Sequence, residues 1–254
     1  MNFVDYRQSI LITRDADYIF SEGVFLNMVS TNRYLKITGD STVNEGKIMY
    51  DFLKSKNVEV KTMIDVGACT GEVSLYFSMK NPKAKILAIE PSTYNFKMME
   101  SNCHMQSFST DNIILLNEAV GDENKTVSIT TDLNSENTLV KNYSKNSEKV
   151  ICDTLDSIIN RHGFSQIDFL KIDIEGAEPL LLESLKKNIG KIKSIIIEIG
   201  DKTVHKDYIP LITLFWESGM RCYERSGGVE IDSFDKLKNR VLSDVVDDLW
   251  FIKK

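Results

Sequence analysis

Short apolar runs alternate with helical patterns of apolar residues over most of the chain after residue 57. Ser194–Ile199 is a nearly continuous apolar run, which is typical of a strand buried on both faces of a parallel sheet. Glu72–Met79 instead places Val73 and Phe77 on one face of a predicted helix. This alternation predicts an α/β fold, a three-layer sandwich in which helices cover both faces of a mostly parallel sheet.

Seven segments have the composition of strands in this sheet: residues 61–67, 84–90, 112–120, 168–172, 194–199, 220–224 and 249–252. Two further short strands, 126–131 and 149–153, flank the polar residues 132–149, which are rich in Asn, Ser, Lys and Glu. A long loop inside a compact domain is usually functional, so we expect residues 132–149 to cover a substrate.

The first 57 residues follow a different pattern. Val24–Val29 has the composition of a strand, and Asn44–Lys56 has apolar residues at helical spacing. We interpret residues 1–57 as an N-terminal β/α cap that shares in covering the substrate, and residues 58–254 as the main domain.

Bulk composition excludes several classes of protein. The chain has 254 residues, 42% of them hydrophobic, and a net charge of −6. The charge and the lack of a long basic run argue against a nucleic-acid partner. No apolar run approaches the roughly 20 residues that span a bilayer, and the first residues do not resemble a secretory signal. The four cysteines form no CxxC pair, so we expect free thiols in a cytoplasmic protein.

The turn Asp65–Gly71 follows a predicted strand and precedes a predicted helix. Gly67 and Gly71 let a ligand approach the backbone closely. Where a dinucleotide-binding turn has its third glycine, this chain has Glu72, which would repel a pyrophosphate. A ligand without phosphate and with a cationic centre fits better, which indicates S-adenosylmethionine. The alternative is a tight turn with no ligand.

Glu90 ends the next predicted strand, at the position where an acidic side chain binds ribose hydroxyls in dinucleotide folds. The alternative is a favourable charge at the start of the helix that follows Pro91 and Ser92. Glu118 and Ala119 end the third strand, where an adenine ring would lie.

The segment Asp173–Glu178 carries three carboxylates, Asp173, Glu175 and Glu178, at the end of another predicted strand. Such groups orient a hydroxyl, act as a general base or bind a divalent cation. The alternative is that Glu178 caps the helix at Pro179 and that Glu175 is solvated. His205 is a further candidate base, although a lone histidine is more often a packing residue. We predict no metal; if one is present, Asp173 and Glu198 would bind it.

The ordered set of motifs resembles the FkbM-type S-adenosylmethionine-dependent methyltransferases. The matching segments are Ile64–Gly71, Ala88–Ser92, Asn117–Asp122, Thr154–Asp156 and Phe169–Glu178, of which the last is the most specific. The sequence departs from the family at Cys69, where an asparagine is usual.

The resemblance implies a class I methyltransferase fold, Rossmann-like, with seven strands and an antiparallel last strand between the fifth and sixth. It implies that Asp65, Gly67 and Gly71 line the methionine end of S-adenosylmethionine, that Glu90 binds the ribose and that Asp173 lies near the transferred methyl group. Glu45 is similar to a glutamate that the family often has before the first strand. The full predicted cofactor set is Glu45, Asp65, Gly67, Ala68, Cys69, Gly71, Glu90, Pro91, Ser92, Glu118, Ala119 and Asp173.

The resemblance also favours an oxygen acceptor. The chain lacks the (Asp/Asn)-Pro-Pro-(Tyr/Phe) sequence that amino methyltransferases acting on nucleobases have after the fourth strand, and it has Lys171–Glu175 there. We therefore expect O-methylation of a hydroxyl on a sugar, a glycan or a secondary metabolite. Two alternatives stay open, a nicotinamide-dependent oxidoreductase and a non-catalytic protein with a vestigial cofactor site. The oligomeric state is left open.

Overall fold

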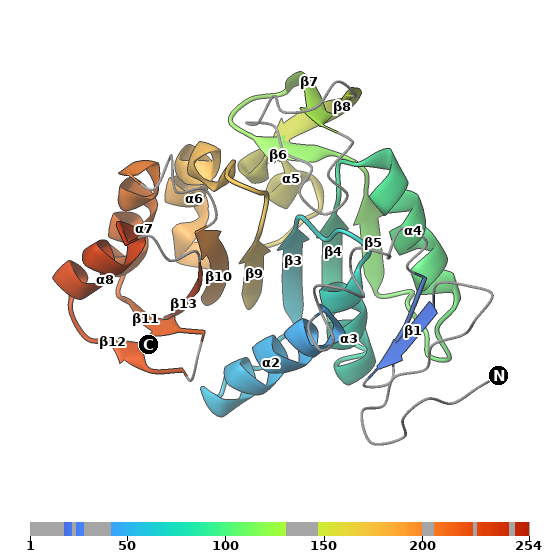
Figure 1. Cartoon of the computed structure of the whole chain (residues 1–254), viewed down its shortest axis with the longest axis horizontal. Helices are drawn as coiled ribbons and strands as arrows, with labels where there is room; N and C mark the ends of the chain where they lie inside the picture. Colours follow the sequence, from blue (N-terminus) through green and yellow to red (C-terminus); the bar gives the residue numbers. More distant parts are fainter. Residues whose placement is uncertain are drawn as a thin grey trace.

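A large, mostly parallel sheet forms the centre of the computed structural model (Figure 1). The structure describes residues 18–21, 24–27, 42–130, 147–199, 206–225, 228–243 and 247–253. Among them, eight strands pair in the order β12-β11-β13-β10-β9-β3-β4-β5. Their bounds are β3 Thr62–Val66, β4 Lys85–Ile89, β5 Ile113–Leu116, β9 Phe169–Ile172, β10 Ser194–Ile199, β11 Met220–Glu224, β12 Glu230–Ile231 and β13 Asp247–Lys253.

The predicted fold class is confirmed. Strands β3, β4, β5, β9 and β10 are parallel, and β13 lies antiparallel between β10 and β11. This is the position expected for the last strand of a class I methyltransferase. The two-residue strand β12 adds an eighth strand at the edge, beyond the seven predicted.

Helices cover both faces of the sheet, as predicted. They are α2 Thr42–Ser55, α3 Glu72–Lys80, α4 Thr93–His104, α5 Leu155–Arg161, α6 Leu182–Asn188, α7 Ile209–Glu217 and α8 Phe234–Val241, with short 3-10 helices η2 Glu178–Leu181 and η3 Ile189–Lys191. One core joins α5, α6, α7 and α8 to side chains such as Ile64 and Val66. The opposite core joins α2 and α3 to Met63 and Phe169. Side chains alternate between the two cores because successive residues of a strand point to opposite faces.

The N-terminal region is described only in part. Strands β1 Tyr18–Ser21 and β2 Val24–Asn27 form an antiparallel pair. Helix α2 packs on the main sheet through Met49, Phe52 and Leu53. The division at residue 57 stays a prediction, and residues 28–41 lie outside the described part of the chain.

The predicted strand 112–120 is wrong as a single strand. The chain leaves the large sheet after Leu116, and β6 (Ala119–Gly121) joins β8 (Ser147–Thr154) and β7 (Lys125–Thr130) in a separate sheet. The physical reason lies at Asn117, whose side-chain amide donates hydrogen bonds to the carbonyl oxygens of Glu90 and Pro91. These bonds take the place of strand pairing and end β5. The small sheet lies on the side toward which the arrows of β3 and β4 point (Figure 1).

Residues 131–146 lie outside the described part of the chain, so most of the predicted loop 132–149 stays a prediction. Residues 147–149 already belong to β8. Every helix among the described residues is too short or too polar to cross a membrane.

Asp168 fixes the starts of three strands at the amino end of the sheet. The side chain is buried, and its Oδ2 accepts hydrogen bonds from the backbone N–H groups of Lys61 and Thr62 at 2.8 and 2.9 Å. Its Oδ1 accepts one from Gln166 at 2.8 Å and lies 2.7 Å from the ammonium of Lys193. One carboxylate therefore links the starts of β3, β9 and β10.

We expect Asp168→Ala to destabilise the protein strongly. The substitution leaves several part-buried donors without an acceptor, so the free energy of unfolding should fall by about 3 kcal/mol. Urea denaturation measures this change. The control is Glu183→Ala, which removes an exposed ion pair with Lys186 and should cost less than about 1 kcal/mol. Equal effects of the two substitutions would contradict this role of Asp168.

Candidate functional site

A cavity opens at the carboxyl ends of the parallel strands, where ligands bind in open α/β sheets. Its walls come from the turns after β3, β4 and β9, from β10, and from Ile129 of the small sheet. Seven carboxylates and one lysine line it within the described residues, the lysine being Lys171 and the carboxylates being Glu45, Glu72, Glu90, Glu118, Asp173, Glu175 and Glu198. The cavity therefore favours cationic groups over anionic ones.

Gly67 lines this cavity at the turn after β3. Its φ is +82°, and a Cβ built on it would lie 1.8 Å from the carbonyl oxygen of Asp173. The backbone N–H groups of Gly67 and Ala68 donate to the carbonyl of Ile89 at 3.0 and 2.9 Å. Only glycine fits here, because the turn after β3 is held between β4 and the end of β9.

Cys69 also has a left-handed backbone, with φ +50°. Asparagine adopts this conformation more readily than cysteine, and asparagine is usual at this position in the family that the sequence resembles. The Cys69 N–H donates to Oε2 of Glu90 at 3.0 Å, so the backbone contact does not need the asparagine side chain. Burial, followed by the nearby Glu72 and Glu90, raises the pKa of the thiol well above its ordinary value. The thiol therefore stays protonated and is a poor nucleophile.

Glu90 is held by the turns on both sides of it. Its Oε1 accepts from the N–H of Ser92 at 2.9 Å, and its Oε2 accepts from Cys69. The side chain is only 5% exposed, and burial raises its pKa to about 7, against the opposing effect of these hydrogen bonds. Each carboxylate oxygen has more than one acceptor site, so Glu90 can still accept bonds from a ligand hydroxyl.

Two charged residues of the cavity were not predicted as site residues. Burial raises the pKa of Glu72 to about 7, and its Oε2 accepts from the Thr70 hydroxyl at 3.1 Å. Lys171 is 5% exposed, and its ammonium lies 2.9 Å from Oδ2 of Asp173 and 3.8 Å from Oδ1 of Asp65. Burial opposes its charge, yet Asp173 and Asp65 together raise the pKa of Lys171 well above its ordinary value. A lysine inside an otherwise apolar strand was the signal that could have identified it.

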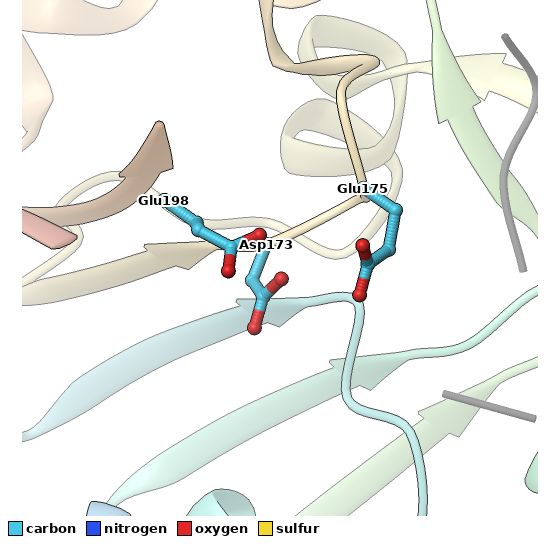
Figure 2. Close-up of side chains that lie close together, drawn as sticks. All are labelled: Asp173, Glu175 and Glu198. Atoms are coloured by element: carbon cyan, nitrogen blue, oxygen red, sulfur yellow. The ribbon is translucent and has the colours of Figure 1, made fainter. Parts of the chain in front are cut away.

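Asp173, Glu175 and Glu198 lie together on one side of the cavity (Figure 2). Each offers a carboxylate oxygen, and these oxygens lie within 4.8 Å of one another. Glu198 comes from β10, whereas the other two follow β9. Burial, followed by Asp173 and Glu175, raises the pKa of Glu198 to about 10. Oxygen atoms this close together are the ligands that a divalent cation takes in proteins, and this is the group of possible metal ligands found among the described residues.

The structure brings most of the predicted cofactor residues to the cavity. The lining residues among them are Glu45, Gly67, Cys69, Glu90, Pro91, Glu118, Ala119 and Asp173. Those outside the lining are Asp65, Ala68, Gly71 and Ser92. Asp65 is fully buried beneath the turn, where it accepts from the Ser74 hydroxyl at 2.7 Å. Burial raises its pKa, which Lys171 opposes.

The predicted catalytic residues separate into three groups. Asp173 and Glu175 line the cavity. Glu178 is fully buried and does not line it, and burial raises its pKa. His205 lies outside the described residues.

Arg225 joins Glu45 to the start of β13. Its guanidinium lies 2.8 Å from Oε1 of Glu45 and 3.0 Å from Oδ2 of Asp248. Glu45 is therefore held at the cavity wall by a residue that follows β11.

Residues 65–222, more than half of the chain, match the family model described as the methyltransferase FkbM domain. Among curated proteins, the chain is 25% identical over 177 residues to the AMB antimetabolite synthetase AmbE of Pseudomonas aeruginosa. That match covers 55% of this chain and 8% of AmbE, so the chain spans a small part of that relative's length.

Two solved methyltransferase structures are similar to the chain. The methyltransferase FkbM from Methylobacillus flagellatus KT is 16% identical, with a TM-score of 0.47, over 76% of this chain and 43% of that one. The plantazolicin methyltransferase BamL, in complex with a triazolic desmethylPZN analog and SAH, is 14% identical, with a TM-score of 0.49, over 88% and 89% of the two chains.

We expect Glu90 to make the stability of the ligand-free protein fall as pH rises. Its pKa is raised in the folded state from 4.5 to about 7, so its contribution is fully present below pH 4.5 and lost as pH rises through 7. The loss amounts to about 3 kcal/mol, at about 1.4 kcal/mol per pKa unit. Urea denaturation between pH 5 and 8 should give a flatter profile for Glu90→Gln than for wild type. Glu183→Gln, at an exposed position, should follow wild type; parallel profiles for wild type and Glu90→Gln would refute the assignment.

Proposed function

Since the chain belongs to the FkbM methyltransferase family, we propose that it uses S-adenosylmethionine to methylate a hydroxyl oxygen of a small molecule or glycan. The observation that carries the proposal is the joint position of Gly67, Glu90 and Asp173 around one cavity. Gly67 supplies backbone that no side chain blocks. Glu90 supplies a carboxylate that can accept hydrogen bonds from hydroxyl groups, and Asp173 lines the same cavity from the end of β9.

The residues of the cavity fit the cofactor in their chemistry. Glu90 would accept hydrogen bonds from the ribose hydroxyls, and Glu118 and Ala119 would lie against the adenine. Glu45 and Glu72 are the carboxylates available for a cationic amino group at the other end. When bound, S-adenosylmethionine supplies a methyl group on a cationic sulfur, and this acidic cavity favours such a charge.

Asp173 is the group that we assign to the acceptor hydroxyl. Its Oδ2 lies 2.9 Å from the Lys171 ammonium, which holds the side chain in place at the cavity, and a carboxylate within reach of a hydroxyl is a general base. Glu175 and Glu198 lie next to it and offer places for a shared proton. The chain thus holds an oxygen nucleophile in place and removes its proton, and positioning of this kind supplies much of the rate in such reactions.

The acceptor that we propose is a hydroxyl on a sugar, a glycan or a secondary metabolite. The sequence Lys171–Glu175 after β9 supports an oxygen acceptor, as does the carboxylate cluster that is suited to proton removal. The similarity to AmbE, an antimetabolite synthetase, supports a secondary metabolite. We keep a divalent cation at Asp173 and Glu198 as an alternative to direct proton transfer.

We expect S-adenosylhomocysteine to bind in calorimetric titration and NADH not to bind. A hydrogen bond to a charged group contributes about 1.5–3 kcal/mol and one to a neutral group about 0.5–1.5 kcal/mol, so Glu90→Gln, whose amide oxygen still accepts, should weaken S-adenosylhomocysteine binding about 5- to 10-fold. Adenosine and 2′,3′-dideoxyadenosine serve as matched ligands, because only the first has the ribose hydroxyls. Glu90→Gln should weaken binding of adenosine and leave that of the dideoxy compound unchanged. NADH binding without S-adenosylhomocysteine binding would favour an oxidoreductase and sink the proposal.

We expect Asp173→Asn to slow methyl transfer much more than it weakens cofactor binding. A general base contributes about 10²- to 10⁴-fold, so kcat should fall by about 100-fold or more. Release of S-adenosylhomocysteine, measured against a panel of hydroxyl acceptors with and without EDTA, gives the rate. Wild type that is unaffected by EDTA would support direct proton transfer, and loss of activity that Mg²⁺ restores would support a cation. Wild-type rates in Asp173→Asn would contradict its assignment.

A further inference from the structure

Glu178 has the contacts of a residue that holds the backbone. Its Oε1 accepts hydrogen bonds from the N–H of Ile174 at 2.8 Å and from the N–H of Gly176 at 3.3 Å. Its Oε2 accepts from the hydroxyl of Tyr208 at 2.5 Å. Glu178 and Tyr208 are both fully buried, and neither lines the cavity. The carboxylate is therefore not placed to reach a ligand there.

The backbone that Glu178 holds is the turn of residues 173–177. Glu175 has φ +57° and Gly176 has φ +96°, so two successive residues adopt the left-handed conformation. For a residue with a side chain this conformation is unfavourable and persists only where surrounding contacts support it. Glu178 accepts hydrogen bonds from the N–H groups of Ile174 and Gly176, which lie on either side of Glu175. The carboxylate therefore stabilises the turn at its strained position.

This turn delivers side chains to the cavity. Asp173, Ile174, Glu175 and Ala177 all line it. The grouping of the Asp173, Glu175 and Glu198 carboxylates in Figure 2 thus depends on how the turn is held.

Tyr208 connects the same carboxylate to a different part of the fold. It immediately precedes α7 and belongs to the core in which α5, α6, α7 and α8 pack on the sheet. Its hydroxyl bond to Glu178 links this core to the turn across 30 residues of sequence.

We infer that Glu178 and Tyr208 are positioning residues, which hold the 173–177 turn so that Asp173 and Glu175 face the acceptor, and that Glu178 is not the base. The inference rests on the proposed methyl transfer for its effect on turnover. It replaces the sequence-based assignment of Glu178 as a catalytic residue. The physical reason is that its carboxylate is fully buried among donors inside the protein and does not line the cavity.

The experiment compares Tyr208→Phe and Glu178→Gln with wild type and with Tyr223→Phe. Tyr223 of β11 is 8% exposed, so its phenylalanine variant controls for removal of a tyrosine hydroxyl away from the turn. Three quantities are measured on the full chain: hydrogen–deuterium exchange of the 173–177 amides, calorimetric affinity for S-adenosylhomocysteine, and kcat/KM for a hydroxyl acceptor. Thermal unfolding verifies that each variant is folded.

In Tyr208→Phe we expect exchange of the 174 and 176 amides to become about 5- to 10-fold faster, which corresponds to loss of about one hydrogen bond. Acceptor kcat/KM should fall about 10-fold, with affinity for S-adenosylhomocysteine within about 2-fold. Glu178→Gln should resemble Tyr208→Phe, since an amide oxygen still accepts from the turn. Tyr223→Phe should match wild type in exchange and turnover.

Unchanged exchange and unchanged turnover in Tyr208→Phe would overturn the inference. It would also be overturned if Glu178→Gln lost the 10²-fold or more expected of a missing base while Tyr208→Phe turned over normally. If Glu178→Gln does not fold, Tyr208→Phe decides alone. If wild type methylates no acceptor, the proposed function fails, and amide exchange still decides whether the pair holds the turn.

Discussion

The close approach of the Gly67 turn to the end of β9 is the contact on which the site depends. The backbone of Gly67 lies where a Cβ would be 1.8 Å from the Asp173 carbonyl oxygen. At this distance the turn after β3 and the turn after β9 share one cavity instead of forming two. The parallel pairing of β3 and β9 sets this approach, because it ends both strands at the same edge. The parallel pairing of β3 with β9 therefore requires a glycine at position 67.

The electrostatics of the cavity follow from this crowding. Strand ends that meet at one edge bring carboxylates together, and burial raises the pKa of Glu72, Glu90 and Glu198. Lys171 sits between Asp65 and Asp173 and offsets part of this repulsion. The result is a cavity that is suited to a cationic ligand and that holds groups able to exchange protons near neutral pH.

Buried carboxylates also serve the architecture away from the cavity. Asp168 joins three strands at the amino end of the sheet, and Glu178 supports the turn at the carboxyl end. Each accepts backbone N–H groups that regular strand pairing leaves free. Within six residues, one carboxylate has a proposed chemical role, at Asp173, and another has a structural role, at Glu178. The two differ because Glu178 is fully buried among hydrogen-bond partners, whereas Asp173 lines the cavity.

The sequence by itself determined the fold class, because strand and helix patterns are local and their alternation favours a mostly parallel sheet. It also identified both turns, since glycines and carboxylates at strand ends are visible without tertiary contacts. Only the tertiary structure decided that β5 ends at Leu116, that Asp65 and Glu178 are enclosed, and that Glu72 and Lys171 reach the cavity. Those outcomes depend on which donors and charged groups the packing brings within hydrogen-bond distance of one another. The order of residues along the chain does not specify these distances.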